Sequence, residues 1–412
     1  MARDFDIVII GGGIVGAATA ALLAHERELE SLSIALVEAR PPGLPPSGDV
    51  DLRVSAISRG SERVLRAVGA WQEATVANAA PYEEMAVWDA ASPVDGRSTL
   101  RFSASATGEA NLGYIAENRR IQWALYGTPA MRQRVTVQRA ELSALELQGG
   151  AARITLSDGR CLSAGLVIGA DGSSSRSREL AQLAIDQRSY AQSAFVTHIR
   201  TQRPHRSTAY QRFLPQGPIA LLPLADGRSS IVWTTTPEDA ASLAAMTDQD
   251  CALAIRDACD AVLGDVELTA PRAHFPLQLI HARAYCRAAF VLVGDAAHSV
   301  HPLAGQGVNM GLLDAAALAE ILTETVRAHG AAAIGDLGAL RRYERWRKSE
   351  NALALGLIDG LNALFSNDNA ALGLLRRSGF ALLNRSRLGK RALIERALGI
   401  GGHVPTIVRR SA

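Results

Sequence analysis

Residues 5–16 read Phe-Asp-Ile-Val-Ile-Ile-Gly-Gly-Gly-Ile-Val-Gly, an apolar run that passes directly into a glycine-rich turn. An apolar run of this kind is typical of a buried strand, and the small apolar residues of 14–23 are typical of a helix packed closely on a sheet. A second strand is expected at 33–38. Strand, helix and strand in this order predict that a doubly wound α/β fold starts at the N-terminus.

The glycines of this turn have the spacing GxGxxG, which predicts a dinucleotide site. Gly11 permits the tight turn, Gly13 lets a pyrophosphate approach the backbone, and Gly16 lets the helix lie close to the sheet. Glu38, at the end of the second strand, can accept hydrogen bonds from ribose hydroxyls. A glycine-rich turn without a ligand is the alternative, and this motif alone does not separate FAD from NAD.

Two later segments favour FAD. Residues 167–178 place Asp171 at the end of a strand, followed by small residues and arginines, although an ordinary Asp-Gly turn would look similar. Residues 291–309 contain a strand, then Asp295, a loop and a helix start. A carboxylate at Asp295 can bind the ribityl hydroxyls of a flavin. The loop at 305–309 offers backbone N–H groups and a positive helix end to the reduced isoalloxazine ring.

Composition narrows the class of protein. A chain of 412 residues exceeds what one core usually supports, so two domains are expected. The net charge of +2 argues against a nucleic-acid partner. The four cysteines show no CxxC pair and no histidines at ligand spacing, which favours neither a metal site nor disulfides and fits the cytoplasm. No apolar run approaches the roughly 20 residues that span a bilayer, so membrane contact is expected to be peripheral.

Strand-like segments interrupt the nucleotide-binding pattern twice, at 82–101 and at 195–236. The fold class predicted is therefore α/β, a Rossmann-type FAD-binding domain with an inserted, mainly β substrate domain and a helical C-terminal region. The expected division is FAD-binding domain 1–80, 111–185 and 276–365, substrate domain 81–110 and 186–275, and basic C-terminal region 366–412. Within it we expect returning strands at 135–137, 166–168 and 290–293, and helices at 312–325, 340–364 and 371–397.

The three glycine and aspartate segments resemble those of the flavoprotein aromatic hydroxylases and, within them, the ubiquinone-biosynthesis hydroxylases UbiH, UbiF and UbiI/VisC. The likeness covers nearly the whole chain. Further runs that carry it are 52–57, 85–89, 112–118, 190–192, 210–213, 217–224 and 231–233. Of these, the runs within 210–233 look specific to the ubiquinone branch, and those at 52–57 and 85–89 look closest to UbiI/VisC.

The resemblance implies a set of site residues. Glu38 matches the ligand of the adenosine ribose, Arg53 the arginine near the pyrophosphate, and Asp171 and Asp295 the two later flavin aspartates; a solvated charge at a helix entry is the alternative for Arg53. The implied cofactor-binding set is Gly11, Gly13, Gly16, Glu38, Arg53, Asp171, Asp295, Gly305, Gly307, Val308 and Asn309. Support of the flavin loop during catalysis is assigned to Pro302, Gly305 and Gln306, with no protein base and no metal, and His298 and His301 are interpreted as structural.

The resemblance also implies the chemistry. Reduced FAD traps O2 as a C4a-hydroperoxide, and the electron-rich ring of a polyprenylated phenol attacks its distal oxygen. The electrons come from NADPH or NADH, or from a protein donor, since no second GxGxxG follows a later strand. Three rivals are an NAD-dependent dehydrogenase, a flavin hydroxylase of a small soluble phenol, and a non-catalytic subunit that binds a lipid precursor.

The C-terminal region is strongly basic. Residues 369–412 hold nine basic side chains against the single acid Glu395. The basic set is Arg376, Arg377, Arg385, Arg387, Lys390, Arg391, Arg396, Arg409 and Arg410. An amphipathic segment of this charge can lie on an anionic membrane at the inner face, or pack on the FAD-binding domain with a solvated basic side. A homodimer and a place in a ubiquinone-biosynthesis complex are alternatives that the sequence leaves open.

Overall fold

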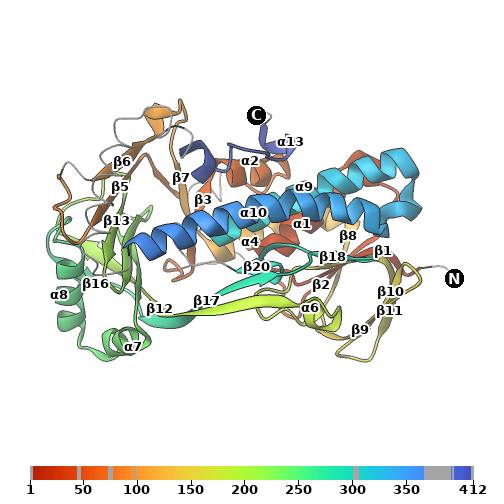
Figure 1. Cartoon of the computed structure of the whole chain (residues 1–412), viewed down its shortest axis with the longest axis horizontal. Helices are drawn as coiled ribbons and strands as arrows, with labels where there is room; N and C mark the ends of the chain where they lie inside the picture. The colour runs from red at the N-terminus through yellow and green to blue at the C-terminus, as the bar shows by residue number, and fades with distance from the viewer. Residues whose placement is uncertain are drawn as a thin grey trace.

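A computed structural model of the chain gives its fold (Figure 1). It describes residues 3–43, 48–72, 78–96, 99–299, 306–365, 391 and 394–409. Within these residues, no helix combines the length and the apolar character that a membrane span requires.

The first sheet is the parallel sheet expected from the N-terminal motif. Its strand order is β18-β19-β11-β1-β2-β8, and the neighbours from β19 to β8 pair in parallel. The strands are β1 (Phe5–Ile10), β2 (Ile34–Val37), β8 (Val135–Gln138), β11 (Cys161–Gly169), β18 (Cys286–Arg287) and β19 (Phe290–Leu292). An antiparallel pair, β9 (Leu142–Gln148) and β10 (Ala151–Leu156), extends from β11. The returning strands expected at 135–137, 166–168 and 290–293 are thus confirmed.

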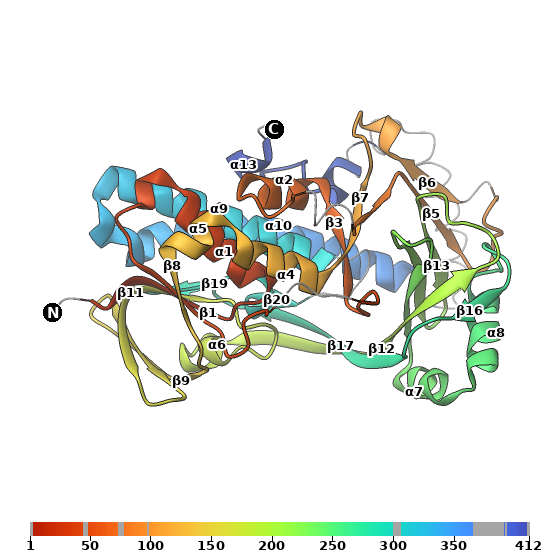
Figure 2. The ribbon, with the colours of Figure 1, turned by 180° about the vertical axis from the view of Figure 1, so that it is seen from behind.

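Helices cover one face of this sheet, while the β9–β10 pair and α6 (Arg176–Leu180) lie on the other side (Figures 1 and 2). The covering helices are α1 (Ile14–His25), α4 (Asn118–Gly127), α5 (Pro129–Arg134), α9 (Gln306–His329) and α10 (Leu337–Phe365). Small residues make α1 fit closely, since Gly16 to Ala24 are all buried. The long helices expected at 312–325 and 340–364 are α9 and α10.

The second sheet joins the two inserted segments. Its order is β20-β17-β12-β15-β14-β13-β5-β6, with β16 at its edge. Strand β5 comes from the first insertion and pairs in parallel with β13 from the second, from Thr208↔Glu84 to Phe213↔Asp89. The strands are β5 (Glu84–Asp89), β6 (Leu100–Ser103), β12 (Ile185–Thr201), β13 (Thr208–Leu214), β14 (Gly217–Pro223), β15 (Ser229–Thr235), β16 (Val266–Leu268), β17 (Ala273–Ala282) and β20 (His298–Ser299).

Two helices that the sequence reading did not anticipate pack on this sheet, α7 (Pro237–Ala245) and α8 (Asp248–Ala258). Each begins at a threonine whose side chain accepts a backbone N–H, Thr236 from Asp239 and Thr247 from Asp250. Leu243 and Ile255 from these helices complete a core with the buried face of the sheet.

The paired strands β12 and β17 run from the second sheet towards the FAD-binding part (Figures 1 and 2). The boundary expected at 275/276 falls inside β17, and the one at 185/186 falls at the start of β12. A third, small sheet, β3-β7-β4, lies between the two larger ones; its strands are β3 (Val54–Ser58), β4 (Ala80–Tyr82) and β7 (Gly113–Glu117).

The described end of the chain packs on the FAD-binding part. The carbonyl of Leu398 accepts the N–H of Gly60, 2.8 Å away, in α2 (Arg59–Ala67). The carbonyl of His403 accepts the indole N–H of Trp346 at 2.8 Å, and α13 (Thr406–Arg409) closes the contact. The helix expected at 371–397 lies mostly outside the described residues. For 394–409, packing on the FAD-binding part is the observed arrangement.

Candidate functional site

The three segments singled out in the sequence meet at one edge of the parallel sheet. Strands β1, β11 and β19 are parallel neighbours, so the residues that follow them lie at the same carboxyl-terminal edge. A Cβ placed on Gly11 would lie 2.6 Å from the carbonyl oxygen of Ala170, next to Asp171. A Cβ on Gly294 would lie 3.0 Å from Val15. We call this edge the rim, and open α/β sheets bind their ligands at such a place.

The glycine turn has one position that faces open space. Gly11 has φ +96° and Gly16 would put a Cβ 1.8 Å from the carbonyl oxygen of Gly11, so both are required by the packing of the turn. A Cβ on Gly13 would meet no protein atom within 4 Å. Its φ of −62° suits any residue, so Gly13 is not needed for backbone conformation. The space beside it fits a bound group such as a pyrophosphate.

Glu38 lies just beyond β2, beside the glycine turn. Its carboxylate accepts the N–H of Gly12 at 2.7 Å and the N–H of Arg40 at 2.9 Å. The amide of Gln122 donates to the Gly12 carbonyl at 2.8 Å, and the hydroxyl of Tyr126 donates to it at 3.2 Å. The carboxylate is therefore fixed by backbone groups, and neither Gln122 nor Tyr126 was anticipated from the sequence.

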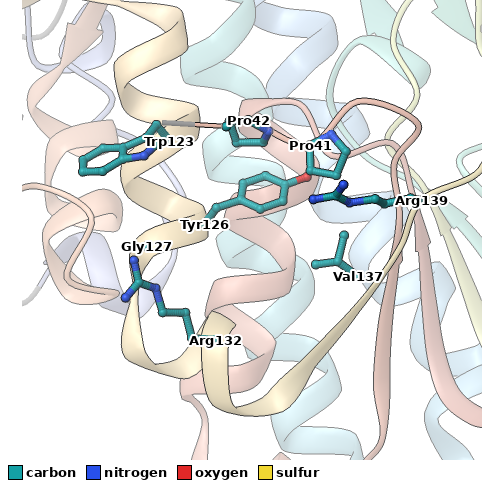
Figure 3. Close-up of a pocket in the computed structure, with 9 residues that line it drawn as sticks. Pro41, Pro42, Trp123, Tyr126, Gly127, Arg132, Val137 and Arg139 are labelled. Atoms are coloured by element: carbon teal, nitrogen blue, oxygen red, sulfur yellow. The ribbon is translucent and has the colours of Figure 1, made fainter. Parts of the chain in front are cut away.

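A cavity of about 280 Å³ opens beside Tyr126, between α4 and the loop that follows β2 (Figure 3). Its lining residues are Pro41, Pro42, Gly43, Trp123, Tyr126, Gly127, Arg132, Val137 and Arg139. Burial and the nearby Glu38 carboxylate raise the pKa of Tyr126, so its hydroxyl stays protonated. Two aromatic rings and two arginines beside Glu38 suit the adenosine end of FAD. The sequence motif identified only the nearby Glu38, because the lining residues come from the loop after β2, from α4, α5 and β8, and from the residue after β8.

Asp171 has an internal set of partners. Its carboxylate accepts from the hydroxyl of Ser175 at 2.5 Å and from the hydroxyl and N–H of Ser177 at 2.7 and 2.8 Å. These contacts close the turn that leads into α6. The backbone of Asp171 nevertheless adjoins Gly11, so the residue shapes the rim, and a direct flavin contact of its side chain stays a prediction.

Asp295 lies in the short helix η3 (Gly294–Ala296), which follows β19. Its side chain is exposed, yet the surrounding protein raises the pKa of the carboxyl by desolvation, partly offset by His298. An exposed aspartate that directly follows β19 at the rim fits a place for the ribityl hydroxyls of FAD.

The helix start that should face the flavin ring is formed by α9. It begins at Gln306, and Gln306, Gly307 and Val308 are partly exposed. Asn309 is buried instead; its side-chain oxygen accepts the N–H of Ser58 at 2.9 Å and its amide donates to Ala56 at 2.8 Å. Its side chain therefore joins β3 to α9. Pro302, Gly305 and His301 lie outside the described residues.

Arg53 is an exposed residue directly before β3, not at a helix entry. Its N–H donates to Asp51 at 2.8 Å and its carbonyl accepts from Asn118 at 3.0 Å, so its backbone is held between two segments of the FAD-binding part. Its assignment to the pyrophosphate stays a prediction.

His298 is fully buried, and its Nε2 lies 2.5 Å from the Asp314 carboxylate. Asp314 also contacts Arg347 and Asn351, and none of these three residues was anticipated from the sequence. Asp314 is a polar position in the buried face of α9, and that interruption of an apolar pattern is the signal that would have identified it. In the part of the chain that the structure describes, no three His, Cys, Asp or Glu side chains lie close enough to hold a metal ion.

A parallel sheet with a glycine turn, an accessible carboxyl and a helix start at one rim defines an FAD-binding oxidoreductase. Residues 4–349 match the model of a family described as "FAD binding domain". The chain is 34% identical over 411 residues to the ubiquinone hydroxylase UbiL of Rhodospirillum rubrum, an alignment that covers 98% of this chain and 92% of the relative. It is 33% identical over 397 residues to the 3-demethoxyubiquinol 3-hydroxylase of Escherichia coli. That alignment covers 96% of this chain and 98% of the relative.

The fold is shared more widely. The structure of p-nitrophenol 4-monooxygenase PnpA from Pseudomonas putida superposes with a TM-score of 0.73 at 16% identity, covering 97% of this chain and 99% of that one. The chain belongs to the FAD binding domain family and, within it, to the ubiquinone-biosynthesis hydroxylases. It is an FAD-dependent monooxygenase, as the resemblance implied, and the predicted fold class is confirmed.

Proposed function

We propose that this chain hydroxylates the aromatic ring of a polyprenylated phenol with O2, as a step of ubiquinone biosynthesis. The observation that carries the proposal is the extent of the similarity. Relatives named as a ubiquinone hydroxylase and a 3-demethoxyubiquinol 3-hydroxylase align with 96–98% of the chain, so the inserted sheet is matched together with the FAD-binding part. The choice of the UbiI/VisC branch stays a prediction.

Bound FAD supplies the activation of oxygen, and this chain supplies its placement. The open space at Gly13 and the cavity beside Tyr126 would take the pyrophosphate and the adenosine. Asp295 would bind the ribityl hydroxyls. The N–H groups and the positive helix end at the start of α9 would stabilise negative charge on the reduced ring.

The remaining partners are proposed on chemical grounds. NADPH or NADH reduces the flavin as a transient visitor, or a protein donor does so. A substrate with a polyprenyl chain resides in lipid, so we propose a cytoplasmic protein placed peripherally on the inner face of the membrane by its basic C-terminal region. Membership of a ubiquinone-biosynthesis complex and a homodimer remain proposals of the same kind.

A matched pair of phenols tests the substrate class. The FAD-loaded protein is given NADPH or NADH and one of two phenols that differ only in a short polyprenyl chain. We expect oxygen consumption and a product heavier by one oxygen with the prenylated phenol, at a kcat/KM at least about tenfold above that of the other phenol. Equal turnover of both would support a hydroxylase of small phenols and contradict the proposal.

A second measurement covers the non-catalytic alternative. A strain lacking the gene is expected to accumulate a polyprenylated intermediate short of one hydroxyl, and a plasmid copy should restore the final quinone. A Gly13→Val copy, expected to fold without FAD, should not restore it. Restoration by that variant would mean that the chain acts as a flavin-free binding subunit.

A further inference from the structure

A group of four polar side chains is buried beneath the rim and is not used by the proposed function. The group, here called the Asp314 cluster, consists of His298, Asp314, Arg347 and Asn351, with exposed fractions of 0–2%. The Asp314 carboxylate receives the His298 ring nitrogen at 2.5 Å, Arg347 Nε at 2.7 Å and Asn351 Nδ2 at 3.1 Å. The Arg347 guanidinium also donates to the Asn351 side-chain oxygen at 2.9 Å.

Stability alone does not explain such a cluster. Removing two opposite charges from water costs about as much as their attraction returns, and apolar residues of the same volume often serve equally well. Burial by itself would raise the pKa of Asp314, but His298 and Arg347 lower it, so the carboxylate is held in its charged form. A carboxylate that stays charged despite the cost of burial indicates a specific role when it accepts a hydrogen bond that an apolar side chain could not accept.

The fourth donor to Asp314 is a backbone group of the rim. The N–H of Gly294 donates to Asp314 Oδ2 at 3.2 Å. Gly294 has φ +60°, and the turn that it starts presents the accessible carboxyl of Asp295. The carboxylate of α9 therefore binds the backbone directly before the residue assigned to the ribityl hydroxyls.

The packing around this contact leaves little room for another arrangement. A Cβ on Gly311 would lie 2.5 Å from Val15 and 3.2 Å from the Cα of Gly294. Helix α9 thus approaches Val15 of α1 through Gly311, and Gly294 lies against both. Asp314 lies one turn beyond Gly311 on α9, and Arg347 joins it to α10. The cluster consequently links α9, α10 and the Asp295 turn beneath the rim.

We propose that Asp314 is a positioning residue for the flavin, acting through the N–H of Gly294 to hold the Asp295 carboxylate in its binding position. The inference rests on the proposed role of Asp295 in binding FAD. Arg347 and His298 serve by keeping the Asp314 carboxylate charged and oriented. Without that charge, the turn is free to rotate the Asp295 carboxylate away from the ribityl chain while the sheet and helices remain folded.

The test compares Asp314→Asn with Glu344→Gln. Glu344 lies on α10 and its carboxylate accepts two backbone N–H groups, from Tyr285 at 2.6 Å and Cys286 at 3.1 Å, but these lie at the start of β18 and not at the rim. FAD is titrated into each apoprotein at a temperature where circular dichroism shows it folded. We expect the FAD dissociation constant to rise at least about tenfold for Asp314→Asn and to change less than about twofold for Glu344→Gln.

A double-mutant cycle separates positioning from general support of the fold. If Asp314 acts through Asp295, then adding Asp314→Asn to Asp295→Ala should change the dissociation constant by less than about threefold. Independent effects that multiply would overturn the inference, and so would wild-type affinity in folded Asp314→Asn. Wild-type affinity in Asp295→Ala would instead remove Asp295 from the cofactor site, which is a failure of the site assignment and not of the substrate proposal.

A second variant covers the case in which Asp314→Asn does not fold because Arg347 is left buried and unpaired. The double variant Asp314→Asn/Arg347→Gln removes both charges, keeps the shape of the first side chain and shortens the second. It is judged by the same criteria, a rise of at least about tenfold in the FAD dissociation constant and loss of that rise in the Asp295→Ala background. Unchanged affinity in this variant would overturn the inference.

Discussion

The rim and the second sheet, which has nine strands, are constrained in different ways, the rim by backbone contacts and the sheet by side-chain packing. At the rim, backbones approach so closely that a Cβ on Gly11 or Gly16 would lie 1.8–2.6 Å from a carbonyl oxygen. In the sheet the constraints are large buried side chains, such as Trp88 and Phe195, which are fully buried. A backbone contact tolerates no added atom, whereas a packed side chain can be reduced at a graded cost. The two regions should therefore fail in different ways.

The largest effect is expected where the rim is open. Gly13→Val should yield a folded protein that binds no FAD, because the new Cβ would meet no protein atom within 4 Å and the side chain would occupy the space assigned to the pyrophosphate. Circular dichroism and the flavin absorbance of the purified variant provide the measurement. Gly16→Val is the matched variant at a closed position and should give no folded protein. Flavin retained by folded Gly13→Val would place the cofactor elsewhere.

The sheet should respond with a loss of stability at unchanged flavin affinity. Trp88 lies on β5, and its ring meets Tyr210 of β13 edge-on with centroids 6.4 Å apart. Trp88→Ala should lower the free energy of unfolding by about 3–5 kcal/mol, and Trp88→Phe by less, since the first removes the whole buried ring system and the second keeps one aromatic ring. Urea unfolding measures the loss. The FAD dissociation constant of the folded variants should equal that of the wild type, and a joint loss would show that the rim depends on the sheet.

The same contrast explains how much of the molecule its sequence predicts. The rim is built from short motifs, each at the end of its own strand, so Gly11, Gly13 and Asp295 can be placed from local order alone. Asp314 and Arg347 are 33 residues apart on two long helices, and nothing local marks them as partners. The pairing of β5 with β13 joins residues more than 120 positions apart, which requires the closed fold.

Helices α7 and α8 were not predicted from the sequence, for a different reason. Their segments are short and rich in alanine and acids, so the apolar spacing is weak even though each is capped by a threonine. Packing on the sheet, through residues such as Leu243 and Ile255, supplies the stability that spacing does not reveal. Capping residues would have been the better signal there.

The C-terminal region extends the contrast to the surface. Residues 394–409 pack on the FAD-binding part, and Arg391 and Arg396 pair with Glu395 and Glu350. Most of the other basic residues, including Arg385, Arg387 and Lys390, lie outside the described residues.

Each basic side chain near an anionic membrane contributes about 1 kcal/mol. Replacing Arg385, Arg387, Lys390 and Arg391 by Gln should therefore weaken sedimentation with anionic vesicles without loss of flavin.

Salt provides the control for that experiment. The Debye length falls from about 10 Å at 0.1 M to about 3 Å at 1 M, so vesicle-bound wild type should be released as salt is raised. Neutral vesicles should retain little protein at any salt concentration. If the wild type ignores anionic vesicles at low salt, the basic region does not serve as a membrane contact, and the lipid substrate must reach the site by another route.

The smallest effect concerns two acids, Asp295 at the rim and Asp314 beneath it, whose pKa values move in opposite directions. The pKa of Asp295 is raised, mainly by desolvation, so the folded chain binds this proton more tightly than the unfolded chain. By linkage, its contribution to stability falls as pH rises from the ordinary carboxyl pKa through the raised folded value, and at neutral pH the charge is unfavourable. Asp314 is the reverse case, because its pKa is lowered by His298 and Arg347 despite burial. Its contribution is present above the ordinary pKa and is lost as pH falls through the lowered folded value.

Asp295→Asn should therefore raise the urea midpoint of the apoprotein at neutral pH, and the gain should disappear as pH approaches about 4. The gain should be less than about 1 kcal/mol, because the carboxyl is exposed and solvent screens it. Asp314→Asn should lower the midpoint at neutral pH, with a difference that shrinks as the pH falls below about 4. If the urea midpoint rises in Asp295→Asn and falls in Asp314→Asn, the rim keeps an unfavourable charge where FAD binds and a favourable charge lies beneath it. A lower neutral-pH midpoint for Asp295→Asn would contradict this, and would make Asp295 a contributor to the fold.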